Sequence, residues 1–408
     1  MTLLLILQIS KYSTMIKEKP VRLLSLDVLR GITIAGMIMV NNPGSWSKIY
    51  TPLGHASWDG LTPTDLIFPF FMFIMGVSMF MSLQKSNFKF SSDFFKKLLK
   101  RSVIIFAIGL AIGWFSILCY GTFDIGKSEL TIFERFKNSV FPYDRIRILG
   151  VMQRLSLSYF FSSLIVVLVN HKYLWRVVIG ILTAYTLILF AGNGLVLSPD
   201  NIIAVVDKAL FGEAHMYKEF LPDGSRIAFD PEGLLSTIPC ISHVLIGFLM
   251  GKVLVNTKDL NEKVQQLLLY GTIMAFVALL LSYGVPINKK VWSSTFVLST
   301  CGFASQFLAI LIWIIDINKK SGWTGFFNSF GVNPLFMYVL GGFLSILFGS
   351  IRFRTEDGII SIKGFIYSNL QNLVGDDYMA SLLFSLFFIA LNAVFGYILY
   401  RKRIYIKI

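Results

Sequence analysis

His55 is the residue of this sequence best suited to acid–base chemistry. It stands in a polar segment, 42–64, between Trp46 and Trp58. An imidazole accepts and releases a proton near neutral pH, so His55 could act as a general base, and the alternative is a structural or solvated histidine. The two tryptophans indicate either an interfacial aromatic belt or a platform for a sugar ring.

Arg147, Gln153 and Arg154 form a second polar group, where a basic segment enters an apolar stretch. Charged side chains inside a membrane span face the bundle interior or a water-filled cavity. Arginine is suited to binding planar anions. We therefore expect either ligand binding or an ion pair with Asp65 or Glu232.

A third group of polar residues lies in the segment 192–237. His215 could join a polar pocket there. The sequence Asp230-Pro231-Glu232-Gly233 is typical of a helix start, with an N-cap, a proline at the first helical position and an acid in the first turn. It predicts that the two carboxylates cap a helix.

Asp27 and Arg30 lie three residues apart in an early apolar segment, so they share one face of a helix. Each side chain, if placed alone near the bilayer, is unfavourable by about 2.5–3.5 kcal/mol. We expect an ion pair that fixes the packing of this helix.

The elements that position these residues are apolar and long. Only 15% of the 408 residues are charged, whereas a soluble domain carries about 25%. Ten stretches contain no Asp, Glu, Lys or Arg: 31–47, 66–84, 102–123, 155–171, 177–199, 233–251, 264–288, 291–315, 321–351 and 378–400. About 20 apolar residues cross a bilayer as a helix, because every backbone polar group must be paired there. The sequence predicts an all-α fold, a polytopic bundle of about ten transmembrane helices in the lipid bilayer.

This composition excludes soluble enzymes, disordered chains and disulfide scaffolds. The net charge of +14 does not require nucleic acid, and we expect no nucleic-acid partner. The three cysteines and four histidines show no metal-ligand spacing, so no metal site is predicted. The hydrolase pattern GxSxG and the zinc pattern HExxH are both missing from the sequence.

The charges also predict the orientation. With ten spans, most of the 37 lysines and arginines fall on the side of the N-terminus, as the positive-inside rule expects for cytoplasmic loops. Both termini are therefore predicted to be cytoplasmic. We expect a cytoplasmic segment over 1–20, with 1–14 ahead of a native start at Met15, and a transmembrane domain over 21–408. Its outer loops 42–64, 121–149 and 192–237 are long enough to hold chemistry.

Helix-breaking residues indicate where spans end. Asn42-Pro43-Gly44 should end the first helix, and Pro63 should lie near the start of the second. Gly331 and Pro334 should divide 321–351 into a short interfacial segment and a helix. The segment 352–377 is expected to be a solvated cap.

Eight short motifs occur in a fixed order along the chain. They are SLDVLRG (25–31), MVNNPGSW (39–46), HASWDGLTPTDLIFPFFMFIMG (55–76), RIRILGVMQRLSLSYFF (145–161), VDKALFGEAHMY (206–217), FDPEGLLSTIP (229–239), VPINKKVWSSTFVL (285–298) and GVNPLFMY (331–338). With these motifs the chain resembles the heparan-α-glucosaminide N-acetyltransferase family of transmembrane acyltransferases, in particular bacterial members without the lumenal N-terminal domain. Lys208, where an arginine is common, and Asp59, where an asparagine or histidine is common, are modest departures.

The resemblance implies transfer of acetyl from cytosolic acetyl-CoA to the amine of a terminal glucosamine on the far side of the membrane. It places the active histidine on His55 and the asparagine that assists it on Asn41. His55 would take the amine proton, and the Asn41 amide would donate to the oxyanion. We favour direct transfer over a route through an acetyl-histidine.

The resemblance also leads to binding roles for further residues. The basic residues Lys97, Lys100 and Arg101 are a topology signal or ligands of the acetyl-CoA phosphates. The predicted acceptor-binding residues are Asp65, Arg147, Gln153, Arg154, His215, Asp230 and Glu232.

The missing lumenal domain leaves the acceptor open, either a glycosaminoglycan-derived oligosaccharide or a smaller amino sugar. An O-acyltransferase of a surface glycan and a secondary transporter for a sugar are the alternatives. The resemblance also implies a homodimer in a bacterial inner membrane, with His55 near the periplasmic face.

Overall fold

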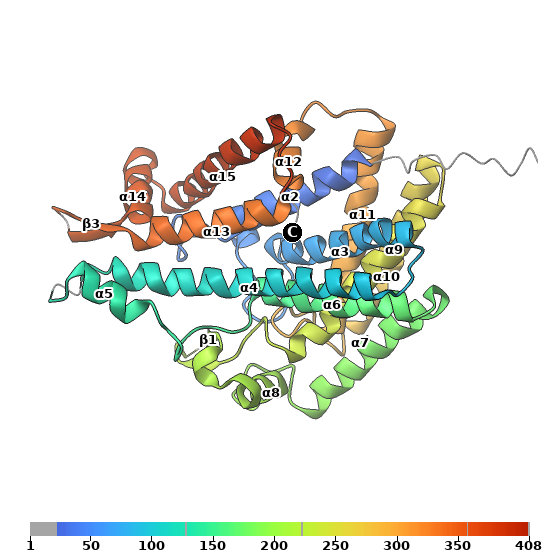
Figure 1. Cartoon of the computed structure of the whole chain (residues 1–408), viewed down its shortest axis with the longest axis horizontal. Coiled ribbons are helices and arrows are strands. Elements are labelled where there is room, and N and C mark those ends of the chain that lie inside the picture. Colours follow the sequence, from blue (N-terminus) through green and yellow to red (C-terminus); the bar gives the residue numbers. More distant parts are fainter. Residues whose placement is uncertain (1–22, 127–128, 222, 357, 407–408) are drawn as a thin grey trace, which may run out of the picture.

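The structure is a computed structural model that describes residues 23–126, 129–221, 223–356 and 358–406. The predictions for segments 1–20 and 1–14 lie outside these residues. The described chain is built of long helices with little sheet (Figure 1), so the predicted all-α fold is confirmed.

Long α-helices make up most of the described chain, and short helical turns join several of them. The α-helices are α2 (Leu24–Val40), α3 (Pro63–Leu83), α4 (Ser92–Thr122), α5 (Ile132–Ser139), α6 (Val151–Leu168), α7 (Leu174–Ala191), α8 (Ile202–Phe211), α9 (Ile238–Asn256), α10 (Leu260–Leu281), α11 (Ser294–Leu311), α12 (Thr324–Gly331), α13 (Pro334–Ser350), α14 (Ile362–Val374) and α15 (Asp377–Arg401). The short helices are η1 (Thr51–Leu53), η2 (Gln84–Ser86), η3 (His171–Tyr173), η4 (Glu213–His215), η5 (Leu235–Thr237) and the π-helical η6 (Ile312–Ile317).

Eight helices of the described chain are long and apolar enough to cross a membrane, and a bent pair makes a ninth. The bent pair is α12 and α13, which meet at 86° with Gly331 and Pro334 at the break, as predicted. The further apolar helix, α2, has 17 residues and ends just before Asn42-Pro43-Gly44. Helix α3 begins at Pro63, also as predicted.

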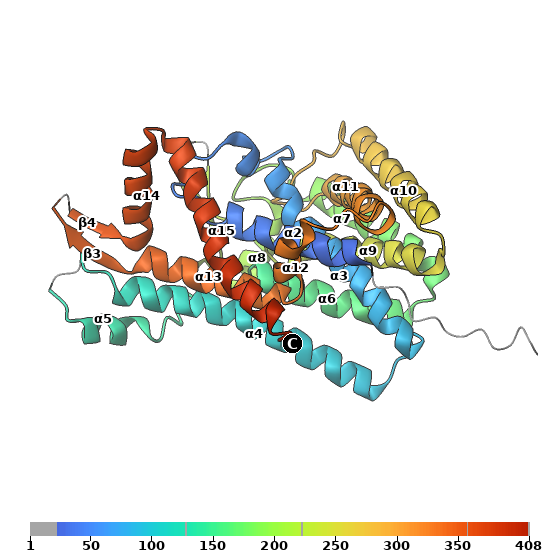
Figure 2. The same cartoon turned by 90° about the horizontal axis from the view of Figure 1, so that it is seen from above.

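Helices α3 and α9 cross at the centre of the bundle (Figure 2). A Cβ added to Gly76 would lie 2.1 Å from the carbonyl oxygen of Val244, and one added to Gly247 would lie 2.2 Å from that of Phe73. The two backbones therefore touch at these glycines. Small residues permit such close approach, which is how helices associate when lipid replaces water.

The ion pair predicted for the first helix is present. Arg30 Nη1 lies 3.1 Å from Asp27 Oδ1, and Arg30 Nη2 donates to Ser78 Oγ on α3 at 2.9 Å. The pair thereby joins α2 to α3, which is the packing role expected of it.

The outer loops contain more structure than the sequence analysis predicted. Loop 192–237 contains α8 and an antiparallel hairpin of β1 (Lys218–Phe220) and β2 (Arg226–Ala228). The expected solvated cap contains α14 and a second hairpin, β3 (Arg352–Thr355) paired with β4 (Gly358–Ser361). Both views place β3, α14 and α5 at the same end of the bundle (Figures 1 and 2).

Candidate functional site

His55 is held by a buried carboxylate. Its Nδ1 lies 2.7 Å from Asp65 Oδ1, and the Asp65 side chain is only 1% exposed whereas that of His55 is 44% exposed. An ionised carboxylate only accepts hydrogen bonds, so the imidazole carries its proton on Nδ1. Nε2 is then an acceptor, and no residue of the described chain hydrogen-bonds it. The arrangement presents a basic nitrogen to solvent, with the ring orientation fixed from behind.

Asp65 owes its position to the start of α3. Thr62 is the N-cap, and the Thr62 backbone N–H and hydroxyl both donate to Asp65 Oδ2, at 3.1 and 2.9 Å. The Ala56 N–H donates to the same oxygen at 3.1 Å. A capping box of this kind satisfies backbone donors that a helix leaves unpaired. Both oxygens of Asp65 are therefore occupied within the protein, which favours a role in orienting His55 over direct contact with an acceptor.

Lys289 is a functional candidate that the sequence analysis did not single out. Its Nζ lies 3.3 Å from Asp65 Oδ1 and 3.1 Å from His55 Nδ1. Because Nδ1 already donates its proton, the ammonium pairs with the carboxylate. Burial lowers the pKa of Lys289, and the charges of Asp65 and Glu232 oppose that shift. A signal was present in the sequence, since two adjacent lysines at 289–290 stand on the side predicted to be extracytoplasmic, where lysine is disfavoured.

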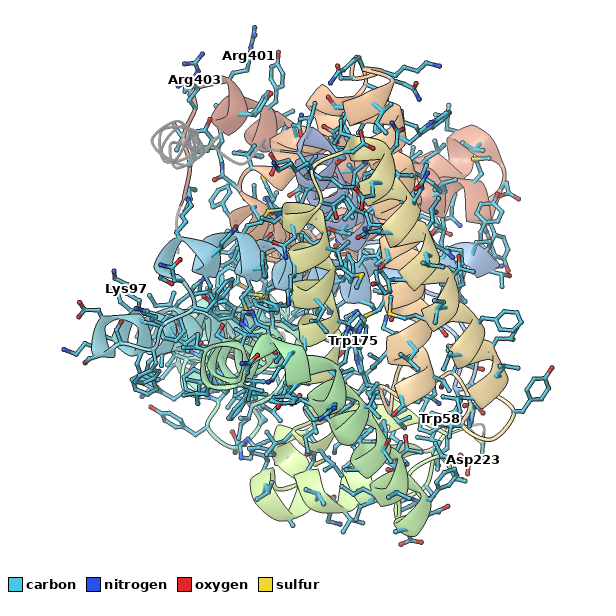
Figure 3. All side chains as sticks on the ribbon, turned by 90° about the vertical axis from the view of Figure 1, so that its right-hand side faces the viewer. Trp58, Lys97, Trp175, Asp223, Arg401 and Arg403 are labelled. Carbon is cyan, nitrogen blue, oxygen red and sulfur yellow. The ribbon has the colours of Figure 1, made fainter. Side chains whose placement is uncertain are left out.

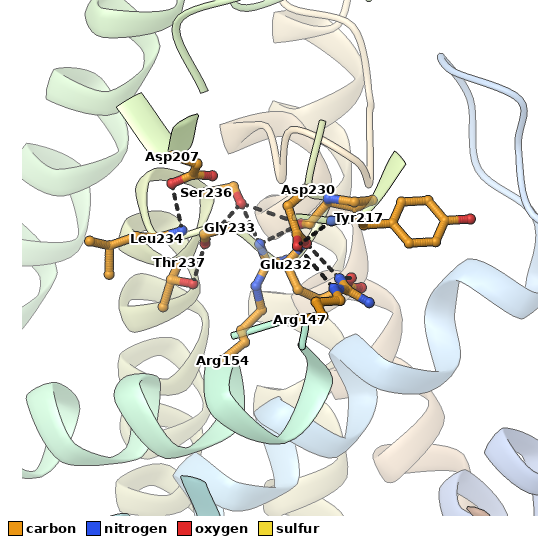
Figure 4. Close-up of polar contacts among 11 residues, drawn as sticks. Arg147, Arg154, Asp207, Tyr217, Asp230, Glu232, Gly233, Leu234, Ser236 and Thr237 are labelled. Carbon is orange, nitrogen blue, oxygen red and sulfur yellow. Dashed lines mark hydrogen bonds and ion pairs between the residues drawn. The ribbon is translucent and has the colours of Figure 1, made fainter. Parts of the chain in front are cut away.

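Arg147 joins two carboxylates in a second cluster (Figure 4). It donates from Nε to Asp230 Oδ2 at 2.9 Å, and from Nη2 to Asp230 Oδ1 and Glu232 Oε2, both at 2.5 Å. Its guanidinium also lies over the Tyr217 ring, 5.1 Å from the centroid. Burial raises the pKa of Glu232, but the charges of Arg147 and Arg154 outweigh it, and the pKa lies below its usual range.

The prediction that Asp230 and Glu232 cap a helix is wrong. Residues 231–232 form a turn, and the chain becomes helical only at η5, from Leu235. Asp230 accepts from the backbone N–H groups of Glu232 and Tyr217, in addition to Arg147. The local pattern of an N-cap was overridden because Arg147, which is partly buried, supplies a stronger, charged partner.

Asp207, on α8, holds this turn in place. Its Oδ1 accepts from the Leu234 N–H at 2.9 Å, whereas Oδ2 is buried without a hydrogen-bond partner among the described residues. Burial raises the pKa of Asp207 to about 6. A Cβ at Gly233 would overlap Asp207 Oδ2, at 1.6 Å, so only glycine fits beneath this carboxylate.

Arg154 is 1% exposed and clamps the same turn. It donates to the Pro231 carbonyl at 2.5 Å and to Ser236 Oγ, and its guanidinium lies 4.9 Å from the Trp292 ring centroid. Arg154 forms an ion pair with neither Asp65 nor Glu232, the two partners considered for it. This burial favours support of the turn over contact with a ligand.

His215 and Gln153 are two further residues predicted to bind the acceptor. His215 Nδ1 hydrogen-bonds the Ile146 carbonyl at 2.8 Å, and the Ile148 N–H donates to the His215 carbonyl at 3.1 Å. These two contacts brace the segment that carries Arg147. Gln153 is 3% exposed and packs against Gly109 of α4.

Asn41 lines a cavity of about 350 Å³ between α2, α4, α6 and α13. Arg147, Gln153 and Tyr338 also line it. On α4 the wall includes Gly109 and Gly113 beside Ile112 and Ser116, and a Cβ at Gly113 would meet open space. No contact among the described residues joins Asn41 to His55, so the role of this asparagine stays a prediction.

The basic residues considered for phosphate binding lie near the start of α4. Arg101 donates to the Tyr159 hydroxyl at 3.3 Å and stacks on that ring. Lys97 extends from the edge of the bundle (Figure 3), and Lys97 and Lys100 are both exposed. Gly109, in the cavity wall, lies eight residues beyond Arg101, or roughly 12 Å along the helix.

Residues 22–287 match the family described as heparan-alpha-glucosaminide N-acetyltransferase, catalytic. The chain belongs to this family. The heparan-alpha-glucosaminide N-acetyltransferases of Homo sapiens and Mus musculus are each 27% identical to it, over 447 and 449 residues that cover 95% of this chain. The chain spans 60% of the length of these relatives. The resemblance stated from the motifs is thereby confirmed, and the matched residues include His55, Asp65 and the Arg147 cluster.

Replacing Arg147 with methionine should destabilise the protein. Asp230 is 2% exposed, and removing one member of a buried ion pair costs about 3–5 kcal/mol because a charge is left uncompensated. We expect a loss of about 3 kcal/mol in the free energy of unfolding, since two backbone N–H groups still bind Asp230. Thermal unfolding in detergent would measure it.

Arg145 supplies the matched control for this variant. It is exposed, and its Nη2 donates only to the Asn138 carbonyl, at 3.4 Å, among the described residues. Arg145→Met should therefore leave the unfolding midpoint nearly unchanged. Equal midpoints for the two variants would show that the ion pair contributes nothing to stability.

Proposed function

We propose that this chain is a membrane acetyltransferase that moves acetyl from acetyl-CoA to the amine of a glucosamine-type sugar. Membership of the family supports the reaction class. The observation that carries the proposal is the imidazole of His55, oriented by buried Asp65 with Nε2 left as an acceptor. An amine must lose a proton to become acetylated, and a positioned histidine is the usual group to accept it.

In the proposed reaction the sugar amine attacks the thioester carbonyl while His55 Nε2 takes the amine proton. The C–N bond forms, the C–S bond breaks, and the proton passes from His55 to the leaving thiolate. Asp65 stabilises the imidazolium that exists between these two transfers. Direct transfer is favoured because one histidine then serves as base and acid in turn.

Asn41 is the proposed oxyanion donor. Its side chain has no hydrogen-bond partner among the described residues and lines the cavity that also reaches Arg147. A single donor of this kind is typically worth about 2.7–4 kcal/mol in the transition state. We propose that the thioester arm of the donor lies in this cavity, along the glycines of α4.

The proposed phosphate ligands of the donor are Lys97, Lys100 and Arg101. All three are on α4, which also forms a wall of the cavity, so one helix would run from the phosphates towards the thioester. In this reading the basic start of α4 faces the cytoplasm, and His55 lies at the extracytoplasmic side of a bacterial inner membrane. We also propose a homodimer, as the family resemblance implies.

The acceptor would bind beside the Arg147 cluster. Glu232 is 20% exposed and Arg147 34% exposed, so both can contact a sugar. Asp230, Arg154 and Gln153 are each at most 3% exposed, and together with His215, which braces the segment of Arg147, they would hold these two in place. Asp65 would act through His55.

The test is acetyl transfer by the detergent-purified protein with labelled acetyl-CoA. We expect label on the amine of glucosamine and none on methyl glucoside, which offers only hydroxyl groups. Label on methyl glucoside alone would favour an O-acyltransferase. Absence of transfer to either sugar, with sugar uptake by reconstituted vesicles, would overturn the enzyme in favour of a transporter.

Asn41→Ala should lower kcat by roughly 10²–10³-fold, because the oxyanion loses one hydrogen-bond donor. Asn369→Ala is the matched control, since Asn369 is exposed on α14 and donates only to the Phe365 carbonyl among the described residues. An unchanged kcat in Asn41→Ala would remove this residue from the mechanism and leave His55 in place.

A further inference from the structure

A second cavity, of about 730 Å³, lies at the other end of the bundle. It is formed where η3 and α7 meet the end of α9 and the start of α10. Figure 3 looks onto the molecule from this side, with Trp175 of the cavity wall where α7 meets α9. A volume of this size is typical of ligand sites in proteins, which measure roughly 300–1,000 Å³.

Three lysines line this cavity: Lys172, Lys252 and Lys258. Among the described residues, no carboxylate lies within ion-pair distance of any of them. Glu262 is the acid in the wall, and it accepts a hydrogen bond from Gln266 Nε2 at 2.9 Å. The cavity therefore has an excess of positive charge and lysine donors available for an anion.

The wall also has an apolar part, which continues onto a lipid-facing surface. Leu249, Met250 and Val253 line the cavity from α9, and Tyr270 lines it from α10. Tyr270 is 38% exposed, and Ile273, one turn further along α10, is 50% exposed. An acyl chain could thus lie along α10 while its headgroup occupies the cavity.

This cavity is separate from the proposed catalytic site. It shares no lining residue with the cavity that contains Asn41. Helix α9 begins next to the Arg154 clamp and lines the second cavity from Leu249 to Asn256. Leu249 lies about 16 Å along the helix from its start, and Asn256 lies about 27 Å from it, which is close to the thickness of a bilayer core.

We propose that this cavity binds the phosphate headgroup of an anionic phospholipid from the leaflet that the sequence analysis assigns to the cytoplasm. The lysine ammonium groups donate charge-assisted hydrogen bonds to the phosphate oxygens. Trp175 and Tyr270 lie at headgroup depth, where aromatic side chains with a polar atom are favoured. Basic pockets between helices on the cytoplasmic side are typical sites for such headgroups.

The test is titration of the purified full chain with phosphatidylglycerol and with phosphatidylcholine, followed by native mass spectrometry. The wild type should bind phosphatidylglycerol more tightly. The triple variant Lys172→Gln, Lys252→Gln, Lys258→Gln should bind it roughly 100-fold more weakly, because each lysine near anionic lipid contributes about fivefold. Its unfolding midpoint in lipid-free detergent should match that of the wild type, because the three lysines have no carboxylate partner among the described residues.

A second triple variant, Lys85→Gln, Lys89→Gln, Lys96→Gln, is the matched control. It removes the same charge from exposed positions on the same side of the bundle, outside the cavity, and should retain wild-type affinity. An equal loss in both variants would overturn the site in favour of diffuse charge attraction. Displacement of phosphatidylglycerol by adenosine 3′,5′-bisphosphate would overturn the lipid in favour of a soluble phosphate ligand.

Discussion

Replacing His55 with alanine should lower kcat for acetyl transfer by about 10²–10⁴-fold, the usual contribution of a positioned general base. The protein should remain folded. Asp65 keeps Lys289 at 3.3 Å and the donors of Thr62 and Ala56, so no buried carboxylate is left without partners. The measurement is the steady-state rate with labelled acetyl-CoA and glucosamine, alongside the midpoint of thermal unfolding.

Two further observations separate chemistry from structure at His55. The His55→Gln variant can still donate an amide hydrogen to Asp65, but it has no basic nitrogen and should be as inactive as alanine. Added imidazole should restore part of the rate in the alanine variant, because it replaces the missing base. Wild-type rates in His55→Gln would exclude His55 as the proton acceptor.

Asp65→Asn should also lower kcat strongly, by roughly 10³–10⁴-fold, with little change in KM. Three donors converge on Asp65 Oδ2, from Thr62 N, Thr62 Oγ1 and Ala56 N. An asparagine must therefore keep its carbonyl oxygen at that position and turn its NH₂ group towards His55 Nδ1. That group would donate to Nδ1 and move the imidazole proton to Nε2, which could then no longer act as a base.

Asp65→Asn should also remove the ion pair that holds Lys289, because the Lys289 ammonium would then face an amide NH₂ in place of a carboxylate. Asp223→Asn serves as the control, since Asp223 lies in an exposed turn where its carboxylate accepts only from Ser225 among the described residues. The two variants should unfold at similar temperatures if the Thr62 cap is retained. A rate within threefold of wild type in Asp65→Asn would show that the carboxylate does not control the tautomer.

Much of the architecture is predictable from local sequence. Stretches without charge must pair their backbone groups internally in a bilayer, so each becomes a helix whatever its neighbours are. Proline and glycine act on their own segment of chain, which is why the break between Gly331 and Pro334 and the start of α3 at Pro63 are both found where they were predicted. His55 could be selected in the same way, because an imidazole in a polar loop is unusual in such a chain.

The partners of the site residues depend on the tertiary structure. Lys289 lies 234 positions from His55, and Asp230 lies 83 positions from Arg147. The pattern around Asp230 and Glu232 favours a helix cap locally, yet in the folded chain the partly buried Arg147 binds both. An N-cap is worth about 1 kcal/mol, and losing one partner of a buried ion pair costs several times more.

The sequence alone therefore determined the class of protein, the long apolar helices, the family and the loop that carries His55. The tertiary structure decided which carboxylate orients His55, that Lys289 joins it, and that Asp207 and Arg154 hold the turn beside Arg147. The physical reason is the range of the forces. Backbone pairing in lipid acts within one segment, whereas buried charges are stable only when the fold brings a distant opposite charge to them.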